Sequence, residues 1–216
     1  MRKTLAATGV AFAVVFAAAC GSASHEPAAE DVAGSHLAVT PEVTWSPLRG
    51  VAVPSGQDGP RSSTGAERTG YARTPHGALL AALNAETAVN LAGDREWARV
   101  LTSMTVPGPG RDEFAAARAL VSVAGEAGDT APRWAGYRWI SWDDKKAVLE
   151  AVTEAPDGAL HARELTVQWM LNPSAAPGEA DGDWRLVLEP SGQAQPPRPV
   201  DSLDSYRPFS AEGSTQ

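Results

Sequence analysis

Cysteine is almost absent from this sequence, since Cys20 is the single thiol among 216 residues. One thiol excludes an internal disulfide framework and any zinc finger built on cysteine pairs. Basic residues are also in deficit, with 18 Lys and Arg against 26 Asp and Glu, which leaves a formal charge of -8. A protein that binds nucleic acid through the phosphates needs a basic surface. We therefore expect no nucleic-acid partner.

The apolar run at the N-terminus is too short for a permanent membrane span. It covers residues 5–19, which is 15 residues, whereas a helix that crosses a bilayer needs about 20. Arg2 and Lys3 precede the run. A positive start followed by a short apolar segment is typical of a signal peptide. We expect residues 1–19 to be removed on export.

The end of this run carries a more specific pattern, Ala17-Ala18-Ala19-Cys20-Gly21. It resembles the bacterial lipoprotein lipobox, in which the cysteine is diacylated and becomes the first residue of the mature chain. Ala17 stands where the lipobox most often has leucine. The resemblance implies that Cys20 is the lipidation site and that the protein is anchored at the extracytoplasmic face of the cell membrane. An ordinary signal peptide that ends near a cysteine is the alternative.

The composition divides the remaining chain into three parts. Residues 20–43 lack apolar periodicity and are predicted to be a flexible tether. Residues 44–189 are predicted to form a single α+β domain, with helices in 75–124 and a sheet in 136–189. Pro47 limits residues 43–53 to an edge strand or an extended segment. Residues 190–216 are proline-rich and are predicted to be a tail.

Three helices are expected in the first half of the domain. Thr74 can cap a helix that begins with Pro75 and continues to about residue 91, and Asp94 can cap a second, short helix. The third is expected from about residue 112 to 124. We expect one face of this helix to be buried, and its residues are Phe114, Ala117, Leu120, Val121 and Ala124.

Beyond Pro132 the apolar period changes from 3.6 to 2. Four strands are predicted, at about residues 137–142, 147–153, 160–171 and 184–188. Their short connections predict an antiparallel meander. We expect an α+β fold in which the helices pack on one face of a curved antiparallel sheet of four or more strands. This order resembles the nuclear transport factor 2-like cone, with a cystatin-like roll as the alternative.

A second resemblance has more local detail. It is carried by Gly50-Val-Ala-Val-Pro54, Gly59-Pro60, Gly70-Tyr71-Ala72, the run from Thr74 to Ala82, and the run from Ser202 to Phe209. These segments resemble an uncharacterised actinobacterial family whose members are exported or membrane-attached and often encoded near plasmid-transfer or integrative-element genes. The resemblance implies that residues 202–209 fold back and dock on the domain.

Patterns that carry chemistry are scarce. No H-E-x-x-H, G-x-S-x-G or phosphate-binding glycine motif occurs, so we expect no metal, no cofactor and no catalytic residues. His76, His161, Asp143 and Glu164 could meet in an internal pocket, or they could simply face solvent. Trp134, Tyr137, Trp139 and Trp142 could form a stacking surface for sugars or a partner, or they could fill the core.

The sequence thus predicts a non-enzymatic, lipid-anchored extracytoplasmic binding or scaffolding protein. Its expected partners are the membrane, through the anchor, and a protein of the envelope. An accessory role in conjugative transfer or envelope assembly follows from the family resemblance. The alternative is a small-ligand-binding or enzymatic cone-fold domain with an internal pocket.

Overall fold

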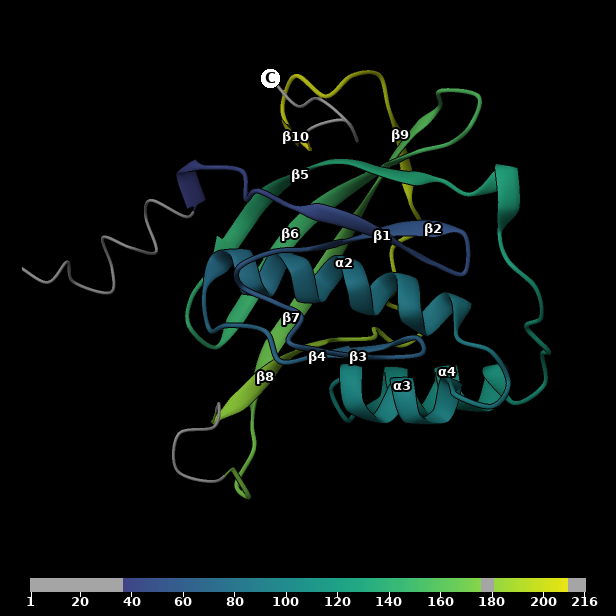
Figure 1. Cartoon of the computed structure of the whole chain (residues 1–216). Coiled ribbons are helices and arrows are strands. Elements are labelled where there is room, and N and C mark those ends of the chain that lie inside the picture. Colours follow the sequence, from purple (N-terminus) through teal and green to yellow (C-terminus); the bar gives the residue numbers. More distant parts are fainter. Residues whose placement is uncertain (1–36, 176–180, 210–216) are drawn as a thin grey trace, which may run out of the picture.

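The computed structural model describes residues 37–175 and 181–209, and they form a mixed α+β fold (Figure 1). The predicted signal peptide, Cys20 and the tether up to residue 36 lie outside the described residues. The α-helices that lie wholly within the described part are α2 (Pro75–Leu91), α3 (Trp97–Met104) and α4 (Pro109–Arg118). A 3-10 turn, η1 (Gly128–Thr130), follows them. Among the described helices, none is both long and apolar enough to cross a bilayer.

Helix α2 begins where its sequence predicts. The hydroxyl of Thr74 accepts a hydrogen bond from the Gly77 N–H at 3.0 Å, and Pro75 occupies the first turn. The cap satisfies one of the free amides of that turn, and proline suits a position where no N–H is needed. Almost every residue of α2 is buried. The helix is therefore the centre of the fold rather than a surface element.

The third helix differs from the prediction. Helix α4 begins at Pro109 and ends at Arg118, so Leu120 and Val121 lie beyond it. The Leu120 side chain is 88% exposed, not buried. The Arg118 guanidinium donates to the carbonyls of Val121 and of Ala92, the latter at 3.0 Å. These bonds turn the chain away from the helix axis and remove the apolar face that a longer helix would have.

Asp94 has a different role from the predicted helix cap. The residue before α3 is Glu96, which makes no side-chain capping bond to that helix. The Asp94 carboxylate instead accepts from the Arg118 guanidinium at 2.9 Å and from the Val123 N–H at 3.0 Å. Asp94 therefore joins the start of α3 to the segment that follows α4.

The main sheet is antiparallel and open. Its long strands are β5 (Arg133–Trp142), β6 (Lys146–Glu154) and β7 (Leu160–Leu171), followed by β8 (Gly182–Leu186). Two short strands complete it, β9 (Arg198–Val200) beside the start of β7 and β10 (Arg207–Pro208) beside β5. The strand order is β10-β5-β6-β7-β8. The four predicted strands are confirmed, and the sequence did not reveal the two short ones.

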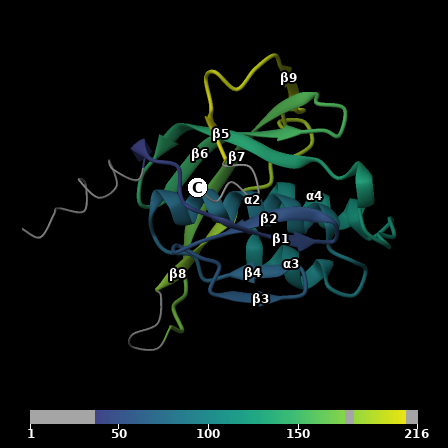
Figure 2. The same ribbon diagram turned by 45° about the horizontal axis from the view of Figure 1, so that its top comes forward.

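Two hairpins precede α2 and stay separate from the main sheet. They are β1 (Thr44–Leu48) with β2 (Val51–Ser55), and β3 (Ser62–Thr64) with β4 (Glu67–Thr69). Figures 1 and 2 show the β1–β2 hairpin alongside α2. Pro47 lies in β1, whose strand pairing is with β2 alone. Residues 45–53 thus lie in this hairpin, which packs on the helix and does not join the large sheet.

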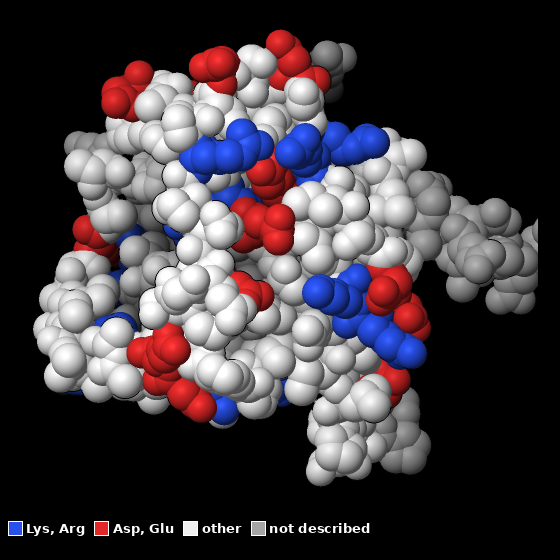
Figure 3. All heavy atoms as spheres, turned by 180° about the vertical axis from the view of Figure 1, so that it is seen from behind, with Lys and Arg blue, Asp and Glu red and all other residues white. Residues whose placement is uncertain are grey.

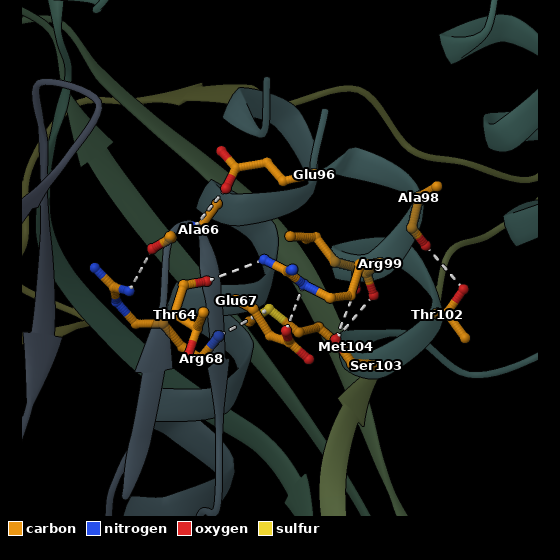
Figure 4. Close-up of polar contacts among 12 residues, drawn as sticks. Thr64, Ala66, Glu67, Arg68, Glu96, Ala98, Arg99, Thr102, Ser103 and Met104 are labelled. Carbon is orange, nitrogen blue, oxygen red and sulfur yellow. Dashed lines mark hydrogen bonds and ion pairs between the residues drawn. The ribbon is translucent and has the colours of Figure 1, made fainter. Parts of the chain in front are cut away.

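The β3–β4 hairpin is held against α3 by polar contacts (Figure 4). The Arg99 guanidinium pairs with the Glu67 carboxylate at 2.8 Å, and the Glu96 carboxylate accepts from the Ala66 N–H at 3.1 Å. The Arg68 N–H lies 3.3 Å from the Met104 sulfur. These contacts fix a hairpin that is too short to be stable on its own.

The core lies between α2 and one face of the sheet. Its fully buried members come from both elements: Ala78, Leu79, Leu80, Leu83, Leu149, Val167 and Leu186. The opposite face carries a smaller apolar cluster. In it, Val200, Leu203 and Tyr206 pack on Ala135, Val152 and Ala162. The last described residue, Phe209, packs on Tyr137 with ring centroids 5.3 Å apart. Residues 198–209 therefore dock on the sheet.

Charge on the surface is mixed. Seen from behind, basic side chains lie next to acidic ones, with uncharged areas between them (Figure 3). No patch of a single sign dominates this view.

Candidate functional site

One candidate site is a mainly apolar cleft of about 440 Å³ between the C-terminal half of α2 and the ends of β5, β6 and β7. We call it the α2 cleft. Its walls are largely apolar and come from five separate parts of the chain: Val51, Leu91, Ala127, Pro132, Trp134 and Pro197. Binding clefts for small molecules are typically of this size and combine apolar walls with a few polar groups.

The polar groups of the α2 cleft come from α2 and β7. Alternation along β7 directs His161 and Arg163 to the same side as the buried residues Leu165 and Val167, which face the helix. Glu86 and Asn90 are one turn apart on α2 and therefore share a face. The cleft is thus lined by a histidine and an arginine from the strand and by a carboxylate and an amide from the helix.

Glu86 and Arg163 form an ion pair at the inner end of the cleft. The Asn90 amide also donates to a Glu86 carboxylate oxygen at 3.1 Å. The Glu86 side chain is only 11% exposed, whereas that of Arg163 is 35% exposed. Burial lowers the pKa of Arg163 from its ordinary value. Pairing with a carboxylate reduces the cost of keeping this charge away from water.

The same ion pair borders a second cavity of about 670 Å³, which we call the α4 cavity. The α4 cavity lies between α4, the end of β8 and residues 188–195. Its remaining titratable groups are all acidic: Glu113, Glu164 and Glu189. Glu86 and Arg163 therefore separate a mainly apolar cleft from an acidic one.

Trp134 forms one wall of the α2 cleft and is fixed by a hydrogen bond. Its indole N–H donates to the Thr87 hydroxyl at 3.3 Å. That hydroxyl in turn donates to the Leu83 carbonyl at 2.9 Å. A buried indole N–H without a partner would destabilise the fold, so this chain of two bonds orients the ring.

Of the two alternatives for the four aromatic residues Trp134, Tyr137, Trp139 and Trp142, the structure favours packing in the core over an exposed stacking surface. Trp134 and Tyr137 are buried, and Trp139 and Trp142 are half-buried against the core. The reason is local. Register shifts in β5 between Trp134 and Gly136, and between Trp139 and Ser141, break strict alternation. Each shift inserts an extra residue, so side chains three apart share the face that the core covers.

The predicted set of titratable residues does not converge. His161 lines the α2 cleft and the exposed Glu164 borders the α4 cavity. Asp143 lies in the β5–β6 turn, where hydrogen bonds from the backbone N–H groups of the next two lysines lower the pKa of its carboxyl. His76 borders a third cavity of about 790 Å³, with its ring 3.7 Å from the Asp58 carboxylate and 3.0 Å from the Val39 carbonyl.

Sequence reasoning missed Glu86, Arg163 and Asp58. A signal existed for Glu86, because it is the one charged residue between His76 and Leu91 in an otherwise apolar helix. Such a position is costly unless a partner is near. Over residues 37–175 and 181–209, no group of three or more histidine, cysteine or acidic side chains is arranged to hold a metal ion.

Comparison with known proteins gives one match. Residues 13–208 match the model of a family described as "Domain of unknown function (DUF8175)". The chain belongs to this family. No curated protein and no solved structure matches this chain significantly.

The residues that line the α2 cleft lie between Val51 and Pro197, so all of them fall within the family match. The family description carries no activity. What the cleft of this DUF8175 member can do therefore follows from its geometry alone. The polar side chains of its interior are bonded to one another, with Glu86 held by Arg163 and Asn90, and Thr87 held by Trp134.

Proposed function

We propose that this protein is a lipid-anchored, extracytoplasmic binding protein whose binding site is the α2 cleft. The observation that carries the binding role is the cleft itself, in which apolar walls from five segments surround one ion pair. The anchor is proposed from the lipobox-like sequence at Cys20. The predicted tether of residues 20–43 would hold the domain near the membrane while leaving it free to turn.

A binding role is favoured over catalysis with Glu86 as the general base. Among the described residues, Glu86 is the only carboxylate that lines the α2 cleft, and it is already paired with Arg163 and Asn90. A general base must be able to reach a substrate proton. Glu86 would have to break both contacts before it could do so.

The finer fold proposal is a nuclear transport factor 2-like domain. It is supported by the element order, with helices first and an antiparallel meander after them, and by the position of α2 across one face of the sheet. In such an arrangement a cleft at the open end of the sheet is a natural ligand site. Fold likeness alone carries no function.

The proposed cellular role is accessory to conjugative transfer or envelope assembly in actinobacteria, with a protein partner in the envelope. This part rests on the family resemblance of the motif segments from Gly50 to Phe209. Membrane attachment would restrict the protein to partners close to the bilayer. The cleft would then carry the ligand, and the outer surface would carry the protein contact.

The anchor and the cleft can be tested together in the native cell. The protein is crosslinked in place and recovered as wild type, Cys20→Ser, Leu91→Trp and Leu120→Trp. Leu91 lines the cleft, while Leu120 is exposed outside it, so the two tryptophan variants are matched in chemistry. Recovered proteins and extractable small molecules are then compared by mass spectrometry.

We expect Cys20→Ser to leave the membrane fraction or to stay unprocessed. We expect Leu91→Trp to remain anchored but to lose the molecules that depend on the cleft, and Leu120→Trp to behave as wild type. Unchanged fractionation of Cys20→Ser together with unchanged processing would contradict the anchor. An identical set of bound molecules in wild type and Leu91→Trp would contradict the cleft as the site.

A further inference from the structure

The unused hydrogen-bonding capacity of the Glu86–Arg163 pair indicates what the α2 cleft accepts. A guanidinium has five N–H donors, and the described residues provide Arg163 with one polar partner, Glu86. Glu86 is the more buried of the two and also accepts from Asn90. The part of the pair that remains accessible is therefore mainly donor and positively charged.

The surroundings of the ion pair determine from which side an anion can reach the Arg163 guanidinium. On the side of the α4 cavity, Glu113, Glu164 and Glu189 line the same space as Arg163 and would repel an anion. On the side of the α2 cleft, the other titratable group is His161, and the walls are apolar. An anionic group can therefore approach Arg163 favourably from the α2 cleft only.

We propose that the α2 cleft binds an amphipathic small molecule with an apolar body and one anionic oxygen group, which the Arg163 guanidinium receives. This proposal rests on the proposed binding function and adds the chemical class of the ligand. The apolar body lies against Leu91, Pro132 and Trp134, where burial of each methylene contributes to affinity. A carboxylate or phosphate end fits the guanidinium because both present oxygens to paired N–H donors.

Glu86 has a defined part in this arrangement. It holds the Arg163 side chain in place, and its charge also competes with the ligand for the same guanidinium. Replacing Glu86 with glutamine removes the charge and keeps the shape of the side chain. It should therefore increase the affinity of the cleft for an anionic ligand and decrease its affinity for a cationic one. The sign of the Glu86→Gln effect thus distinguishes the two classes.

The test uses the purified full chain with Cys20→Ser, which keeps an acyl group out of the assay. Decanoate, decanol and decylammonium have the same chain length and differ in the charge of the head group. Their binding is measured by isothermal titration calorimetry. We expect decanoate to bind at least tenfold more tightly than the other two, and each added methylene to improve affinity about fourfold until the cleft is full.

The variants then assign the effect to the cleft. Arg163→Gln should lower the affinity for decanoate at least tenfold, and Glu86→Gln should raise that affinity. Arg133→Gln is the matched control, because Arg133 is an exposed arginine on β5 that pairs with Glu154 outside the cleft. Equal binding of decanoate and decanol to the unsubstituted protein would overturn the proposal without any variant. So would a Glu86→Gln protein that is folded by circular dichroism and binds decanoate more weakly.

The anionic group could come from a free amphiphile or from a lipid head group. Sedimentation with phosphatidylglycerol and phosphatidylcholine vesicles separates these sources. Selective binding to phosphatidylglycerol that is lost in Arg163→Gln supports a lipid, and decanoate binding without vesicle binding supports a free amphiphile. Binding of neither overturns the ligand class. If Leu91→Trp still loses bound molecules in cells, the binding function stands although the ligand class has failed.

Discussion

The hydroxyl of Tyr206 donates a hydrogen bond to the carboxylate of Glu150, 2.9 Å away across the outer face of the sheet. The same carboxylate accepts from Arg198 at 2.7 Å and from Arg138 at 2.6 Å. Burial raises the pKa of Glu150, but the hydrogen bonds from the two guanidiniums and the phenol outweigh it and leave the pKa below its ordinary value. One buried carboxylate therefore fastens the C-terminal segment to the domain.

Substitution of Glu150 should release this segment. We expect Glu150→Gln to lower the free energy of unfolding by about 1–3 kcal/mol, because the bonds from Arg138, Arg198 and Tyr206 lose their charged acceptor. Amide exchange should rise across residues 198–209 and stay unchanged in α2. Tyr206→Phe keeps the ring over Arg138 and removes only the hydroxyl, so we expect a loss of about 1 kcal/mol.

Ser202→Ala is the control for the docked segment, since Ser202 is exposed and bonds only within its own turn. Protection that persists over residues 198–209 in Glu150→Gln would show that the apolar contacts of Leu203 and Val200 are sufficient for docking. It would contradict the role given to the carboxylate.

We expect Asp94 to make the free energy of unfolding depend on pH in the acidic range. Hydrogen bonds from the Ser122 hydroxyl, the Val123 N–H and the Arg118 guanidinium lower the pKa of Asp94 to about 2. A carboxyl whose pKa is lower in the folded state stabilises the fold above its unfolded pKa, and this contribution disappears as the pH falls through the folded pKa. The stabilisation is thus complete above about pH 5 and is lost near pH 2.

The measurement for Asp94 is urea unfolding of wild type and Asp94→Asn at several pH values. We expect wild type to be the more stable at neutral pH and the difference to shrink as the pH approaches about 2. A difference that is the same at pH 2 and pH 7 would mean that the loss arises from shape and not from charge.

Asp183 joins β8 to the segment before α2. Its carboxylate accepts from the Gly70 N–H at 2.8 Å and the Tyr71 N–H at 3.0 Å. Burial raises the pKa of Asp183 although these bonds act against it. We expect Asp183→Ala to cost about 1–3 kcal/mol of unfolding free energy, because two buried amides lose their acceptor. Asp181→Ala, at an exposed position nearby, should change stability little; equal losses in both variants would contradict this account.

Gly110 marks the closest approach of α4 to the end of β8. A Cβ added at Gly110 would meet the Leu188 carbonyl oxygen and carbon, which are backbone atoms that cannot rotate away. We expect Gly110→Ala to destabilise the fold by about 1–3 kcal/mol through overpacking. Gly108 has open space around it, so Gly108→Ala should be tolerated. Thermal unfolding of the two variants tests this expectation. Equal melting temperatures would show that α4 can move to accommodate the added methyl group at Gly110.

Local patterns in the sequence were sufficient for the start of α2 and for the four predicted strands, but not for the bounds of α4 or for the short strands. The Thr74 cap and Pro75 define the start of α2, and a period of two defines β5 to β8, since both depend on residues only a few positions apart. The export signal and the Cys20 pattern are local in the same way. They stay predictions, because they lie outside the described residues.

The site was decided by the tertiary structure. Glu86 and Arg163 are far apart in the chain, and nothing near either residue indicates that they pair. The register shifts in β5 moved four aromatic rings toward the core, although strict alternation would have divided them between two faces. Strands β9 and β10 exist because Glu150 and the outer face hold the C-terminal segment in place. Short-range sterics and hydrogen bonding fixed the elements, whereas burial of side chains from distant segments determined where charges meet and which surface remains open.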